Sequence, residues 1–152
     1  MIPILYEPNE TEYLTNGIGR LSSAVSCVVT EDNSGYYELE IRYPIIGKHY
    51  KDIEVDEIIL AKPSQDARTQ PFYIYNISRP INGIVTINAR HISYKLAGMV
   101  VMPYTADNCR EALISIPDNT VEECPFTFDT DKAVVGPFAI IEPTSVRSLL
   151  GG

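Results

Sequence analysis

Tryptophan is absent from this chain, and histidine and cysteine are scarce: 152 residues include two histidines and three cysteines. The cysteine number is odd, no two cysteines lie close together, and no Cys-x-x-Cys motif occurs. These features argue against a disulfide framework and against a zinc or redox motif, and they favour a reducing compartment during folding. Cys27 falls on the apolar side of an alternating segment, so we expect it to be a small core residue.

Long apolar runs and an excess of basic residues are also missing. No run approaches the roughly 18–20 residues that span a membrane, and the first ten residues lack the pattern of a signal peptide, so we expect no membrane association. Lysine and arginine number 12 against 20 aspartates and glutamates, which gives a formal net charge of −8. The basic residues are scattered, and we therefore expect no specific binding to nucleic acid.

Tyrosine, proline and alternating segments are abundant instead. Ten tyrosines and eleven prolines stand in a chain that is 45% hydrophobic. Frequent proline suits short strands joined by turns better than long helices. We predict a mainly β fold, in which residues 1–100 form a β-barrel-like domain. Residues 101–152 are expected to begin a small α+β subdomain that is incomplete at the end of this sequence.

The plainest element is a β-hairpin over residues 25–43. Its arms alternate apolar and polar residues, and turn residues Asp32–Gly35 lie between them. A second hairpin is predicted from strands 72–79 and 84–91, joined by Asn82-Gly83. Shorter strands are expected at 2–6 and 57–61.

The pattern changes beyond residue 100. Thr105 is expected to cap a helix over residues 106–116, because apolar residues recur there at helical spacing. Short strands are predicted at 124–128 and 138–141. Thr144 is expected to cap a last helical turn that ends at Gly151.

No residue set points to catalysis. Gly47-Lys48 lacks the upstream glycine and the following serine or threonine of a phosphate-binding loop. His91 lies on an alternating strand and is expected to be structural. The carboxylate pairs at 122–123 and 129/131 are too sparse for a glycosidase or a calcium loop. A cysteine–histidine pair assembled by the fold stays open. We expect no catalytic residue, no metal and no cofactor.

Several segments together carry a family resemblance. They are IPILYEPNETEYLTNGIGRL at 2–21, AVSCVVTEDNSGYYELEIRYPIIGKHY at 24–50, IILAKPS at 58–64, QPFYIYNISRPINGIVTINARHISYKLAG at 70–98 and SVRSLLGG at 145–152. In this order and spacing they resemble the N-terminal region of phage minor structural proteins, the prophage tail endopeptidase (tail-associated lysin) and tail-spike family.

The resemblance implies a function in the virion. Its members build the baseplate hub at the tail tip from β-barrel domains, as a homotrimer that docks to the distal tail protein and the tail tube with its tape measure protein. Full-length relatives continue into a peptidoglycan endopeptidase or a host cell attachment module. We therefore expect a structural, non-enzymatic protein of the virion tail tip, assembled in the host cytoplasm. The alternatives are part of a cell-wall hydrolase or a host glycan-binding module.

Tyrosine and arginine favour protein interfaces, and they recur on the outward faces of the predicted strands. The candidate interface residues are Tyr36, Glu38, Glu40, Arg42, Tyr73 and Tyr75. The same tyrosines also suit packing at the edge of a core, and that alternative stays open. Lysine in place of both Glu38 and Glu40 is expected to preserve the fold and impair tail assembly.

Overall fold

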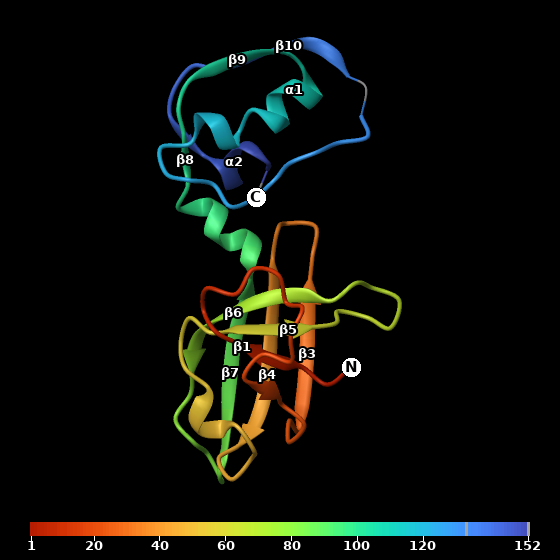
Figure 1. The fold of residues 1–152 in the computed structure, drawn as a ribbon, viewed down its shortest axis with the longest axis vertical. Helices are drawn as coiled ribbons and strands as arrows, with labels where there is room; N and C mark the ends of the chain where they lie inside the picture. Colours follow the sequence, from red (N-terminus) through yellow and green to blue (C-terminus); the bar gives the residue numbers. More distant parts are fainter. Residues whose placement is uncertain (133, 152) are drawn as a thin grey trace. The chain divides into compact units, whose positions relative to one another are not determined.

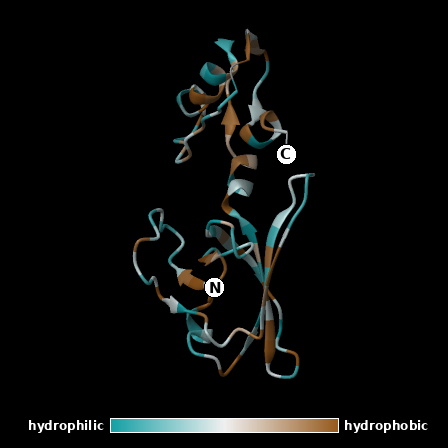
Figure 2. Ribbon diagram, turned by 90° about the vertical axis from the view of Figure 1, so that its right-hand side faces the viewer, coloured by the Kyte–Doolittle hydropathy of each residue, from teal (hydrophilic) through white to brown (hydrophobic). Residues whose placement is uncertain are grey.

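The computed structural model describes residues 1–132 and 134–151. It is mainly β, as the sequence predicts. The chain folds into two compact units, Met1–Ile92 and Ser93–Gly152, each with most of its residue contacts inside itself. Figure 2 shows hydrophobic stretches on the strands of both units. Each unit therefore has apolar strand faces of its own to bury.

The first unit is a curled antiparallel sheet that forms a half-barrel (Figure 1). The strands follow the order β2-β1-β5-β6-β7-β4-β3 across the sheet. Their bounds are β1 Ile4–Tyr6, β2 Gly19–Arg20, β3 Ser26–Glu31, β4 Tyr37–Pro44, β5 Ile58–Ala61, β6 Gln70–Ile77 and β7 Ile84–His91, with a short 3-10 helix, η1, at Tyr50–Asp52. Every strand pair is antiparallel.

Both predicted hairpins are confirmed, and local turn chemistry explains them. In the first hairpin, the Asp32 carboxylate accepts hydrogen bonds from the backbone N–H groups of Ser34 and Tyr36 at 2.8 and 3.2 Å. In the second, Asn82 and Gly83 both have positive φ, 52° and 76°. Two positive φ angles define the turn whose twist matches that of paired strands.

The core of the first unit lies on the inner side of the curled sheet. Alternation along β4 buries Leu39, Ile41 and Tyr43 and leaves Glu40 and Arg42 exposed, as the sequence predicts. Matching buried residues come from the neighbouring strands: Leu5, Leu21, Ile53, Ile59, Ala61, Phe72, Ile74, Val85, Ile87 and Ala89. Burying such side chains is worth about 1.5–3 kcal/mol each for the larger ones. The inner face is therefore what holds the half-barrel together.

The expectation that Cys27 is a core residue is wrong. Cys27 pairs with the buried Ile41 and so lies on the inner side of the sheet, yet its side chain is exposed. The reason is that β3 is the last strand of the sheet. Val25 and Val28 beside it are also exposed, at 58% and 53%. The alternation of apolar and polar residues predicts which face of the sheet a side chain lies on, but it does not predict whether that face is covered.

The second unit holds short strands and short helices. Its elements are η2 Ile92–Ala97, which begins at the junction, β8 Val100–Val101, β9 Tyr104–Asn108, α1 Cys109–Ile114, η3 Pro117–Asn119, β10 Val135–Ile140, β11 Thr144–Ser145 and α2 Val146–Leu149. Strand β9 pairs with β10, and β8 pairs with β11. Its core cluster consists of the buried residues Leu96, Val101, Ile116, Ile140 and Val146, with Phe126, Phe128 and Phe138 packed against them. This unit is therefore a small α+β arrangement with its own core.

The predicted helix over residues 106–116 starts too early. Residues 104–108 form β9, because they pair with β10, and the helix begins only at Cys109. Its cap is Asn108 and not Thr105: the Asn108 side chain accepts a hydrogen bond from the Glu111 N–H at 2.9 Å. Helical spacing of apolar residues did not reveal the competing strand partner, which lies about thirty residues further along the chain.

Two further predictions in this unit need correction. Residues 124–128 form no strand, although Phe126 and Phe128 pack into the core. The last helix is capped by Ser145 and not by Thr144, with the Ser145 hydroxyl accepting from the Ser148 N–H at 3.1 Å. The strand expected at 138–141 is present within β10, and Gly151 has the positive φ, 86°, of a helix-ending glycine.

Candidate functional site

A polar cluster lies on the outer face of the sheet, and Glu38 is its centre. Its Oε1 accepts a hydrogen bond from Arg90 Nε at 3.1 Å, and its Oε2 accepts from the Tyr75 hydroxyl at 2.9 Å. The Tyr36 hydroxyl donates to the same Oε2 at 3.3 Å. The Arg90 guanidinium lies 4.2 Å from the centre of the Tyr75 ring, a cation–π distance.

Strand register brings these residues together. Glu38 of β4 lies opposite Arg90 of β7, and Arg90 lies opposite Tyr73 of β6. Tyr75 occupies the point where the pairing of β6 with β7 shifts, so its side chain reaches the cluster from a β-bulge. Burial, followed by the hydrogen bond and the charge of Glu38, raises the pKa of Tyr75. The Tyr75 hydroxyl therefore stays protonated and remains a donor at neutral pH.

The six predicted interface residues do not form one group. Tyr36, Glu38 and Tyr75 meet in the cluster. Tyr73 also lies on the outer face, opposite Arg90. There it packs against a small apolar group formed by Tyr6, Ile58 and Leu60, which is separate from the main core. Glu40 and Arg42 are exposed, opposite Asn88 and Thr86 of β7.

The Glu38 side chain is only 14% exposed and accepts three hydrogen bonds, so it holds the outer face together. We therefore expect lysine at position 40 to leave the fold intact and lysine at position 38 to destabilise it. Sequence reasoning missed Arg90, which supplies the positive charge of this cluster. The only local signal was its place in the alternating stretch 84–91, where it shares a face with Asn88.

The outer edge of β3 is the second notable feature. Natural sheets protect an edge strand with lysine, proline or a bulge. Strand β3 has neither lysine nor proline, its charged residue Glu31 stands at its last position, and its pairing with β4 is regular from Ser26 to Glu31. Within the described part of the chain, no strand pairs with the other side of β3. Its backbone N–H and C=O groups are therefore available to an added strand.

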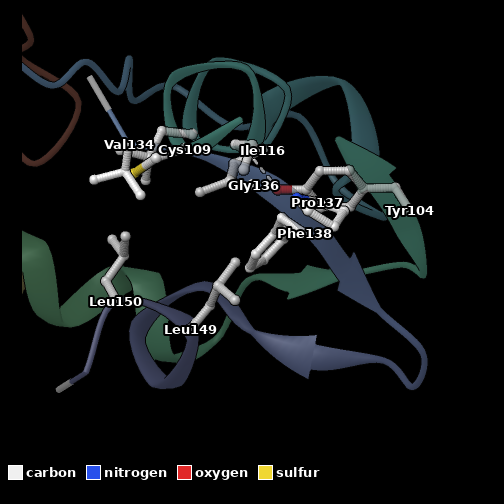
Figure 3. Close-up of a pocket in the computed structure, with 11 residues that line it drawn as sticks. Tyr104, Cys109, Ile116, Val134, Gly136, Pro137, Phe138, Leu149 and Leu150 are labelled. Atoms are coloured by element: carbon white, nitrogen blue, oxygen red, sulfur yellow. Dashed lines mark hydrogen bonds between the residues drawn. The ribbon is translucent and has the colours of Figure 1, made fainter. Parts of the chain in front are cut away.

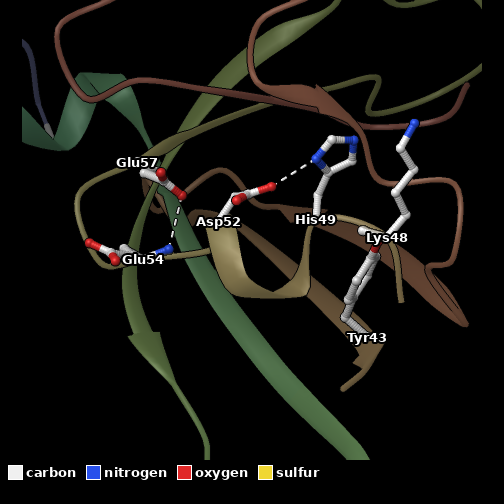
Figure 4. A network of polar contacts seen from close by, with 6 residues as sticks. All are labelled: Tyr43, Lys48, His49, Asp52, Glu54 and Glu57. Atoms are coloured by element: carbon white, nitrogen blue, oxygen red, sulfur yellow. Dashed lines mark hydrogen bonds and ion pairs between the residues drawn. The ribbon is translucent and has the colours of Figure 1, made fainter. Parts of the chain in front are cut away.

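Polar contacts also fix the loop between β4 and β5 (Figure 4). His49 Nδ1 lies 2.8 Å from the Asp52 carboxylate, and the buried Glu57 accepts a hydrogen bond from the Glu54 N–H at 2.9 Å. Burial, opposed by that hydrogen bond and assisted by nearby acidic groups, raises the pKa of Glu57 to about 6. Nothing in the sequence indicated that Glu57 is buried, because a glutamate at the first position of the predicted strand 57–61 looks like a surface residue.

The second unit contains an apolar hollow of about 370 Å³. Figure 3 shows Tyr104, Phe138 and Leu149 around it, with Cys109 and Val134 further along its wall. The Tyr104 hydroxyl donates to the Ala112 carbonyl at 2.5 Å and is therefore already engaged. The described residues that line the hollow are apolar apart from Tyr104 and Cys109, so it offers mainly packing surface.

His91 and the metal-ligand residue types were the other candidate functional groups in the sequence. The His91 ring stacks on Tyr37 at 4.5 Å and its Nε2 lies 3.2 Å from Gln70 Oε1, which agrees with a structural histidine. Across residues 1–132 and 134–151, no three His, Cys, Asp or Glu side chains gather closely enough to hold a metal ion. No helix in those ranges has the length and apolarity needed to cross a membrane.

Comparisons with known proteins add no assignment. No protein-family model matches the chain, and neither the curated proteins nor the solved structures contain a match to it. The fold and the surfaces described above are therefore the structural basis for a functional proposal.

Proposed function

We propose that this chain is a structural component of a phage or prophage tail tip, a hub domain that acts by docking to neighbouring tail proteins. Two observations support the proposal. The segments at 16–21, 31–44 and 80–98 resemble the hub region of tail-associated proteins. The half-barrel fold is of the β-rich kind that such a hub uses.

The edge of β3 is the observation that carries the docking role. A six-residue strand is about 20 Å long, and roughly half of its residues direct their backbone groups toward the free side. An added strand gains main-chain hydrogen bonds there, and side-chain contacts give it specificity. Val28 and Val25 supply exposed apolar contacts beside this edge.

The partner in this proposal is the distal tail protein, with tube and tape measure proteins beyond it. Trimers of the hub are also proposed, at the tail tip of the virion. The net charge of −8 opposes association of identical chains, so we expect self-association to be weaker than binding to a less acidic partner.

The test mixes the chain with the distal tail protein of the same phage and measures complex formation by analytical ultracentrifugation. In Val28→Lys, a charge on the edge strand should weaken binding about tenfold or more while the circular dichroism spectrum stays unchanged. Ile46→Lys is the matched control, because Ile46 is 93% exposed in the same unit but lies outside the sheet. Equal affinity of both variants would remove β3 from the interface.

Two results would overturn the proposal as a whole. One is the absence of any complex between the unmodified chain and tail proteins. The other is clearing of bacterial cell walls by this chain in zymography, since a hydrolase is the leading alternative and a purely structural domain gives none.

A further inference from the structure

A hollow of about 530 Å³ opens in the first unit between two segments that are distant in the sequence. One wall is the loop that enters and forms β2, and the other is the turn after β4. The side chains and backbone around it come from Asn16, Gly19, Arg20, Ser22, Lys48 and His49. Two basic residues, a serine and an asparagine therefore border one hollow in a chain whose net charge is −8.

The two cations are not used elsewhere in the described part of the chain. The ion pairs of residues 1–132 and 134–151 include neither Arg20 nor Lys48. Both side chains are exposed, so they are free to turn toward a ligand. The Asp52 carboxylate, three residues from His49, is engaged by the His49 ring at 2.8 Å.

The turn that carries Lys48 and His49 is held rigidly. The hydroxyl of Tyr43, a fully buried residue, donates to the Lys48 carbonyl. Gly47 lies so close to the Tyr43 ring that an added Cβ would be 2.6 Å from it. His49 has a φ of 69°, a left-handed conformation that costs a residue other than glycine about 1 kcal/mol or more. Only a well-packed turn keeps such a conformation.

The His49 ring joins the two walls of the hollow. Its Nδ1 faces Asp52, and its other side lies against Gly19, where a Cβ would come within 2.3 Å of Nε2. Figure 4 shows the Lys48 side chain extending beside this ring, away from Tyr43. Glycine at position 19 is therefore needed for the ring to bridge the turn and β2, and the ring in turn fixes the distance between the segments that carry Arg20 and Lys48.

We infer that this hollow is a binding site for a phosphate group. A phosphate dianion matches the two unpaired cations, whereas a carboxylate matches one. The guanidinium of Arg20 suits paired phosphate oxygens, Lys48 adds a second charge, and Ser22 and Asn16 supply neutral donors. The geometry differs from the glycine-rich phosphate loop of nucleotide-binding proteins, because the donors are side chains on two separate segments.

The test records ¹H–¹⁵N NMR spectra of the full chain while inorganic phosphate is added at constant ionic strength. We expect saturable shifts of the Gly19 and Lys48 amides and of the His49 ring, with the rest of the spectrum unchanged. Removal of either charge, in Arg20→Gln or Lys48→Gln, should weaken phosphate binding about tenfold, since each removes a charge-assisted contact. Lys51→Gln is the control, because Lys51 is exposed two residues from His49 and does not line the hollow.

Acetate, titrated in the same way, should bind more weakly than phosphate. Non-saturable shifts, equal affinities for phosphate and acetate, or an effect of Lys51→Gln as large as that of Lys48→Gln would each overturn the assignment. The experiment needs no tail protein, so its failure leaves the docking proposal untouched, and failure of docking leaves this site untouched.

Discussion

Glu57 is the buried carboxyl whose removal should change stability most clearly with pH. Glu57 is only 7% exposed, directly before β5, and its carboxylate accepts a hydrogen bond from the Glu54 N–H at 2.9 Å. Glu7, Glu54 and Asp52 add negative charge nearby. Burial and these charges favour the protonated acid in the folded chain.

The sign and size of the pH effect on stability follow from the pKa of Glu57 in the unfolded and in the folded chain. The pKa rises from the ordinary 4.5 to about 6 on folding. Folded chains therefore bind more protons than unfolded ones between these values, and the free energy of unfolding falls as pH rises through this window. Since one pKa unit is worth about 1.4 kcal/mol, ionised Glu57 costs the fold about 2 kcal/mol above pH 6.

Glu57→Gln should remove this cost and keep the hydrogen bond, because the glutamine Oε1 still accepts from the Glu54 N–H. We expect no difference from the unmodified chain below pH 4.5 and a gain of about 2 kcal/mol at pH 7.5. In a unit of 92 residues that gain corresponds to a rise of roughly 8–16 °C in Tm.

The assay is urea and thermal unfolding of the first unit, followed by circular dichroism across this pH range. Glu40→Gln is the control, because Glu40 is exposed on β4 and has no buried surroundings. A gain for Glu57→Gln that is the same at pH 4 and pH 7.5, or a matching profile for Glu40→Gln, would refute the reasoning.

Two further predictions concern the stability of the first unit. Glu38→Ala should lower the free energy of unfolding in urea by about 1–3 kcal/mol, because it removes the acceptor that Arg90 and Tyr75 share. The losses caused by Glu38→Ala and Tyr75→Phe should be less than additive in the double variant. Additive losses would argue against a shared network. Gly17→Ala should lower the free energy of unfolding more than Gly83→Ala. Both glycines have positive φ, but only at Gly17 would the new Cβ meet a backbone oxygen, 2.2 Å away. Equal losses of stability would show that the clash is relieved.

Local chemistry explains why the two hairpins were predictable. The Asp32 turn and the Asn82-Gly83 turn each make their defining contacts within four residues, and the strands beside them alternate in the pattern that burial later follows. The information needed for these elements lies within a dozen consecutive residues. The same applies to Gly151 at the end of the last helix.

The errors share a different cause. Residues 104–108 carry a helical spacing of apolar side chains, yet they pair with a strand that begins at Val135. Cys27 lies on the apolar side of its strand, yet β3 is the last strand in the order of its sheet and the side chain is exposed. In both cases the outcome depends on a distant segment, or on the lack of one, and a short sequence window carries neither kind of information.

The outer polar cluster shows the same limit at the level of the site. Glu38 and Tyr75 could be selected as candidates because each stands on an outward face of a predicted strand. Their contact spans 37 residues, and the contact of Glu38 with Arg90 spans 52. A shift of one residue in the register of β4 against β7 would turn Glu38 to the core side and break its hydrogen bonds with Arg90 and Tyr75. The cluster therefore helps to specify the register of the half-barrel, and a docking partner at β3 would meet a sheet whose pairing Glu38 has already stabilised.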